Sequence, residues 1–77
     1  MLSLGARKAL GDIVETGYSY GGYRMIVQWH NGVDVAQVSV YDYSKRLPLM
    51  WSKTMTKRQA NGAIVLFENI GYFDMPL

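Results

Sequence analysis

The sequence predicts an α+β fold, a two-layer sandwich in which a three-stranded antiparallel sheet carries two helices on one face (αβββα). Three observations predict it. Apolar residues recur at helical spacing near both ends of the chain, two alternating segments flank an Asn-Gly pair, and a third apolar segment follows them. Only one face of such a sheet would be apolar, so both helices must cover that face. We expect the 77 residues to form a single small domain, 1–77.

The composition excludes several kinds of site. The chain has no cysteine and one histidine, so it offers neither a disulfide framework nor a thiolate or histidine metal site. We therefore expect no metal and no cofactor. Its longest apolar run, residues 63–67, is too short to cross a bilayer. The first eight residues lack the features of a secretory leader, and we expect a cytoplasmic location without a membrane partner.

The first predicted helix spans residues 3–16. Its polar residues fall on the side opposite the apolar ones, and Gly17 is placed to end it. The apolar positions are Ala6, Ala9, Leu10 and Ile13.

The segment YSYGGY, residues 18–23, is then expected to join this helix to a strand. Its two glycines suit a reversal of the chain. Tyr23 falls on the predicted core face, which leaves Tyr18 and Tyr20 as the aromatic residues of this segment available for recognition.

A hairpin is predicted from residues 23–30 and 33–42, because Asn31-Gly32 between them is the dipeptide that a type I′ turn prefers. A two-residue loop pairs Val27 with Ala36 and makes one face wholly apolar. The remaining pairs on that face are Tyr23 with Val40 and Met25 with Val38. The opposite face is mixed and carries Arg24, Ile26, Gln28 and His30 across from Ser39, Gln37, Val35 and Val33.

The segment LPLMWSK, residues 47–53, is predicted as the third strand, with Leu49 and Trp51 directed to the core. Pro48 cannot donate to a ladder and therefore indicates an edge strand. An uncovered edge also allows a homodimer through strand pairing.

The second helix is predicted to begin at Thr56. Thr56 and Gln59 have the spacing of a capping box, and Gly71 is placed to end the helix. Its inner stripe is predicted to consist of Ala60, Ala63, Ile64, Phe67 and Ile70.

We expect no catalytic residues and no enzyme activity. General acid–base or nucleophilic catalysis needs two suitable groups close together, whereas the six carboxylates are scattered and His30 stands beside a turn. The hairpin register keeps Asp34 away from Asp42. The glycine pair precedes a strand instead of opening a helix, so it is not a phosphate loop.

The main electrostatic feature is a basic stretch between Asp42 and Glu68 that contains no acid. A nucleic-acid backbone is the partner that such a cluster favours, through release of counterions. The alternative is that these charges only keep a small protein in solution. The basic residues are Lys45, Arg46, Lys53, Lys57 and Arg58.

The stretch TKRQANGAI, residues 56–64, resembles the start of the second helix in double-stranded-RNA-binding domains, which share the predicted element order. The resemblance implies that Lys57 and Arg58 contact phosphates while small residues pack on the sheet. Asn61 occupies the position where that motif has a third basic residue. The predicted hairpin loop is also shorter than in that family, leaving His30 and Asn31 at its tip.

Two further resemblances point to the exposed sheet face. The pattern of strands followed by a helix resembles the DNA-binding arms of phage integrases, in which Arg24, Gln28, Gln37 and Ser39 would read DNA. In size and style the chain also resembles phage-encoded inhibitors that dock on a host protein, anti-CRISPR proteins among them. Such an inhibitor would act in the host cytoplasm, and tyrosine and arginine, here Tyr41 and Arg24, are common interface residues. The apolar and aromatic docking patch would comprise Ile26, Val33, Val35, Tyr41, Tyr43 and Met50.

The leading functional prediction is a binding module that contacts nucleic-acid phosphates through the basic start of the second helix. The alternative is the phage inhibitor that docks on a host protein.

Overall fold

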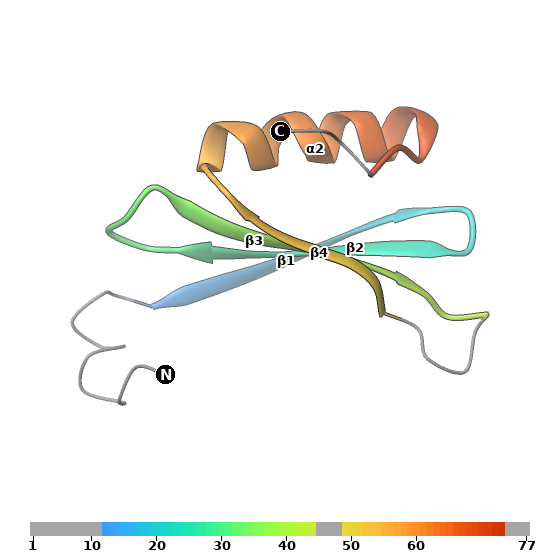
Figure 1. Cartoon of the computed structure of the whole chain (residues 1–77), viewed down its shortest axis with the longest axis horizontal. Helices are drawn as coiled ribbons and strands as arrows, with labels where there is room; N and C mark the ends of the chain where they lie inside the picture. The colour runs from blue at the N-terminus through green and yellow to red at the C-terminus, as the bar shows by residue number, and fades with distance from the viewer. Residues whose placement is uncertain (1–11, 45–48, 74–77) are drawn as a thin grey trace.

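The computed structural model describes residues 12–44 and 49–73. These residues form one four-stranded antiparallel sheet in the order β1-β2-β3-β4, with a single helix, α2, lying along one face (Figure 1). The fold is therefore α+β with an antiparallel sheet, as predicted. The elements are β1 (Ile13–Tyr20), β2 (Tyr23–His30), β3 (Val35–Asp42), β4 (Leu49–Met55) and α2 (Lys57–Ile70).

The prediction of three strands and two helices is wrong, because the described residues contain four strands and one helix. Ile13–Tyr20, which overlaps the end of the predicted first helix, is a strand. Ile13, Val14 and Thr16 are β-branched, which disfavours a helix and suits a pleated sheet. Residues 3–11 of the predicted helix lie outside the described residues.

The segment YSYGGY has a different role from the predicted one. Its first three residues end β1, its last begins β2, and the glycine pair is the tight turn between the two strands. Tyr20 pairs with Tyr23 across this turn. Gly21 has a φ of 57°, a left-handed value that glycine adopts without steric cost. The segment is thus a β-hairpin instead of a joint between helix and strand.

The register between β2 and β3 differs from the prediction by two residues. Val27 pairs with Val38, and the loop comprises the four residues 31–34 instead of Asn31-Gly32 alone. A shift of two residues preserves the face of every side chain, so the predicted apolar face is still the buried one. The longer loop leaves the Asp34 side chain free to accept a hydrogen bond from the backbone N–H of Lys57, at 3.0 Å.

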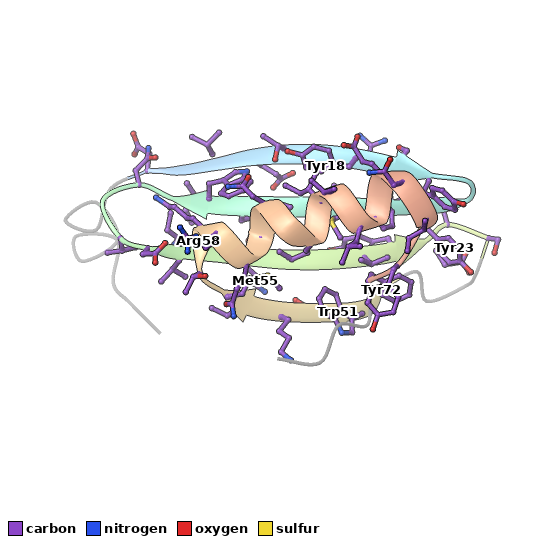
Figure 2. The ribbon with its side chains drawn as sticks, turned by 90° about the horizontal axis from the view of Figure 1, so that it is seen from above. Tyr18, Tyr23, Trp51, Met55, Arg58 and Tyr72 are labelled. Carbon is purple, nitrogen blue, oxygen red and sulfur yellow. The ribbon has the colours of Figure 1, made fainter. Side chains whose placement is uncertain are left out.

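The core lies between the sheet and α2. Trp51 and Phe73 pack at its border, with ring centroids 6.1 Å apart, and Figure 2 shows Trp51 beside the chain that leaves the helix. The buried apolar residues are Met25, Val27, Ala36, Val38, Val40, Met55, Ala60, Ala63, Ile64 and Phe67.

β4 is an edge strand, as predicted, but it spans Leu49–Met55 instead of residues 47–53. Trp51 is half-buried against the core, as predicted. Strand alternation places Lys53, opposite Val38, on the same helix side of the sheet as Trp51. The side chains of Leu49 and Met50 lie outside the described part of the structure.

Both predicted ends of α2 are confirmed. The hydroxyl of Thr56 accepts from the backbone N–H of Gln59 at 3.2 Å, and the Gln59 side chain accepts from the backbone N–H of Thr56 at 3.0 Å. Gly71 ends the helix with a φ of 70°. The inner stripe is confirmed except for Ile70, which is 62% exposed. The backbone of Gly71 makes the close approach to β1 instead, since a Cβ there would lie 2.5 Å from the Tyr20 ring.

Gly71→Ala should therefore destabilise the protein by more than the cost of a left-handed alanine alone, about 1 kcal/mol. The methyl group would both strain the backbone and displace the Tyr20 ring, which packs edge-on against Phe67. Urea unfolding followed by tryptophan fluorescence measures the change. Gly62→Ala is the matched control, because a Cβ at this exposed helix position meets nothing within 4 Å, and alanine there should stabilise the helix. Equal effects of the two variants would contradict this account.

Candidate functional site

The sheet face opposite α2 is not covered by any of the described elements (Figure 1). We call it the outer face. It is defined by strand alternation and by the observed pairing. Its residues are Ile13, Glu15, Gly17, Ser19, Arg24, Ile26, Gln28, His30, Val35, Gln37, Ser39, Tyr41, Ser52 and Thr54.

Hydrogen bonds between strands order the polar side chains of the outer face. The Gln28 amide donates to a Glu15 carboxylate oxygen at 3.4 Å, joining β2 to β1. The Gln37 amide donates to the Ser52 hydroxyl at 3.2 Å, and the hydroxyls of Ser39 and Ser52 lie 3.1 Å apart. These hydrogen bonds join β1 to β2 and β3 to β4, so they order the polar side chains of the outer face.

Tyr41 of the outer face and Tyr43, which directly follows β3, form an aromatic pair at this face. The rings of Tyr41 and Tyr43 are stacked, with centroids 5.9 Å apart and an angle of 16° between their planes. Tyr43 is 61% exposed. The two rings border a shallow, open hollow of about 390 Å³. Its lining residues are Glu15, Ile26, Gln28, Gln37, Ser39, Tyr41 and Tyr43.

The outer face carries little net charge. Of the residues that define the outer face, only Arg24 and Glu15 carry a formal charge at neutral pH. The guanidinium of Arg24 extends over Gly17, where a Cβ would lie 3.2 Å from Nη2. A nucleic-acid backbone is usually bound by several cations, and this face of amides, hydroxyls and tyrosines does not present such a cluster.

The basic start of α2 is a separate site. Figure 2 shows Arg58 at this end of the helix, on the side away from the outer face. The first turn contains no acidic residue, but the backbone N–H of Lys57 already donates to the carboxylate of Asp34. The N–H of Gln59 is also bonded, to Thr56. Asp34 therefore supplies negative charge at the helix start and offsets part of the local positive charge.

The structure divides the predicted site residues between these two places. Strand pairing brings Arg24, Gln28, His30 and Tyr41 together on the outer face. Lys57, Arg58 and Asn61 belong to α2, and Lys53 lies on the helix side of β4. Lys45 and Arg46 lie outside the described residues.

Tyr18 and Tyr20 lie on the helix side of β1, where both make internal contacts. The Tyr18 hydroxyl donates to the Thr16 hydroxyl at 3.0 Å. The Thr16 oxygen also accepts from the Trp29 indole N–H, at 2.8 Å. The Tyr20 ring packs against Phe67 with centroids 6.4 Å apart. These contacts give both tyrosines a structural role within the fold.

The sequence reasoning missed the contribution of β1 to the outer face, because it assigned residues 3–16 to a helix. Glu15 and Ser19 are therefore new members of the site. The signal that could have found them is the alternation of Val14, Thr16, Tyr18 and Tyr20, which is typical of a strand with one packed face.

Within residues 12–44 and 49–73 no three His, Asp or Glu side chains are grouped so that they could hold a metal ion. Asp34 precedes β3 and Asp42 ends it, so the two carboxylates lie at opposite ends of that strand. The described part of the chain contains no helix long and apolar enough to cross a membrane. Comparison with protein families, curated proteins and solved structures finds no match for this chain.

Proposed function

We propose that this protein is a non-enzymatic binding module that docks on another protein through its outer face. One observation carries the proposal: an ordered, nearly neutral sheet face bearing a stacked tyrosine pair stands uncovered by any described element. Interfaces between proteins favour tyrosine and arginine at their centres and disfavour lysine and acids. An inhibitor that blocks a host protein is the specific form of this function that the size and style of the chain suggest.

The basic start of α2 supports a second candidate, binding of a nucleic-acid backbone by Lys57 and Arg58. The observation in its favour is a first helical turn with two cations and no acid. Asp34 weakens this candidate, because it already occupies the Lys57 N–H and brings a negative charge to the same place. No such opposing charge weakens the case for the outer face, so we place protein docking first.

Capture from a nuclease-treated lysate of the cells that make the protein separates the two functions. Ser39→Arg places a long, charged side chain at the centre of the outer face, while Lys57→Ala with Arg58→Ala removes the helix charges. We expect the unaltered protein and the helix variant to retain one protein partner and Ser39→Arg to lose it. Capture that is absent, or that fails only in the helix variant, would contradict docking through the outer face.

A direct nucleic-acid assay completes the comparison. Labelled duplex DNA, duplex RNA and single strands are titrated at about 50 mM salt, where electrostatic binding is strong. We expect no binding that depends on Lys57 and Arg58. Binding that falls steeply with salt, and whose salt slope flattens in the Lys57→Ala/Arg58→Ala variant, would instead support the phosphate function.

A further inference from the structure

The two edges of the sheet differ in how well they are protected from pairing with another strand. β4 has an extra residue, since Val40 pairs with Trp51 and Tyr41 with Leu49, and it also carries Lys53. A bulge and a lysine are common protections of an edge strand. β1 has neither over its eight residues, and it pairs only with β2 among the described strands. The edge of β1 is therefore the one suited to accept a further strand.

The backbone groups that β1 presents at this edge follow from its pairing with β2. The N–H of Asn31 donates to the carbonyl oxygen of Asp12 at 3.0 Å, so the backbone of Asp12 is turned toward β2. Hydrogen-bonded positions alternate along an antiparallel strand. The even-numbered residues of β1 therefore bond to β2. The residues whose N–H and C=O groups point away from β2 are Ile13, Glu15, Gly17 and Ser19.

We propose that two copies of this chain pair through β1, antiparallel, about a two-fold axis at Gly17. In this arrangement Gly17 bonds to Gly17 of the second copy, and Glu15 lies opposite Ser19 of that copy. The two sheets become one continuous sheet of eight strands, and the two outer faces become one surface. The pairing rests on the edge of β1 and does not depend on whether the outer face docks a partner.

Apolar complementarity on the helix side selects this register. Val14 is 49% exposed and Tyr20 is 41% exposed, which is unusual for the large residues of a packed face. With the axis at Gly17, Val14 lies opposite Tyr20 of the second copy in a position without backbone hydrogen bonds, where side chains approach most closely. Each side chain then covers the other. Moving the axis to Thr16 would leave Tyr20 opposite Asp12 and lose this contact.

Charge complementarity on the outer face supports the same register. The Arg24 guanidinium reaches across to Gly17 at the β1 edge. Arg24 pairs with Ser19, which in the dimer lies opposite Glu15 of the second copy. The dimer thereby places a carboxylate next to this arginine, with the short side chain of Ser19 between them.

Disulfide trapping tests the register directly, because the chain contains no cysteine of its own. In Gly17→Cys the two cysteines face each other across the axis, at a Cα separation of about 5.5 Å that permits a disulfide. In the control Glu15→Cys the two cysteines are offset by four residues along the paired strands, which separates their Cα atoms by roughly 13 Å. We expect mild oxidation to give a covalent dimer with Gly17→Cys and not with Glu15→Cys. Equal trapping of both variants, or of neither, would overturn the proposal.

Sedimentation of the full chain over a range of concentrations measures the association itself. Gly17→Pro removes the N–H that points away from β2 while leaving the hydrogen bonds to β2 in place. Gly17→Ala keeps that N–H and only moves the flexible end of Arg24. We expect the proline variant to dimerise about tenfold or more weakly than the alanine variant, with the circular dichroism of both unchanged. A wild-type chain that stays monomeric, or a folded proline variant that dimerises as well as the alanine variant, would refute pairing through β1.

Discussion

Replacing Phe67 with alanine should remove about 3–5 kcal/mol from the free energy of unfolding. Among the described residues Phe67 is the largest fully buried side chain, and its ring contacts Tyr20 of β1 from the C-terminal end of the buried helix stripe. A domain of this length has a total stability of roughly 4–12 kcal/mol, so the substitution removes a large part of it. Urea unfolding at several temperatures, followed by circular dichroism, measures the loss.

Leu66→Ala is the matched control for this change. Leu66 is the neighbouring helix residue, is 38% exposed and lies outside the buried stripe of α2. Its truncation should cost about 1 kcal/mol or less, because little apolar surface is uncovered. Similar losses for Leu66→Ala and Phe67→Ala would mean that α2 does not pack on the sheet through the observed stripe.

The second large effect is on binding. Tyr41→Ala combined with Tyr43→Ala should weaken the complex with the docked protein by about 30-fold or more, the effect of removing an interface hot spot of about 2 kcal/mol. The stacked pair is the main aromatic feature of the outer face, and Tyr43 extends well into solvent. Titration calorimetry with the captured partner measures the change in affinity.

Tyr72→Ala is the control for the tyrosine pair. Tyr72 is 40% exposed, but it follows α2 and lies on the helix side of the sheet (Figure 2). We expect its removal to leave the affinity for the partner within about twofold. A loss of affinity with Tyr72→Ala and none with the Tyr41→Ala/Tyr43→Ala variant would place the docking surface on the helix side.

The sequence predicted the second half of the fold better than the first. Around α2 the local signals agree with the tertiary structure, because the Thr56 and Gln59 side chains and the Gly71 backbone set the helix ends through their own hydrogen bonds and dihedral angles. In β1 the signals conflict. Ile13 fits the helical spacing of the residues before it, while the strand forms because its alternate residues can pack on α2, which lies about 50 residues further along the chain.

The candidate site could also be predicted only in part, because some of its features follow from local sequence patterns and others depend on distant contacts. The outer positions of β2 and β3 follow from strand alternation, which survives a register error of two residues, so Arg24, Gln28 and Tyr41 were placed on one face correctly. Glu15 was missed with its strand. The role of Asp34 at the helix start depends on a contact across 23 residues, which no local pattern in the sequence encodes.

Photo-crosslinking in the cells that make this protein tests its central claim most directly. A photoreactive amino acid is placed at Gln37, which is exposed in the middle of the outer face, or at Asn61, which is exposed on α2 near the basic residues. Docking through the outer face predicts a specific protein adduct from position 37 and none from position 61. Adducts from position 61 alone, or adducts with nucleic acid in place of protein, would contradict it.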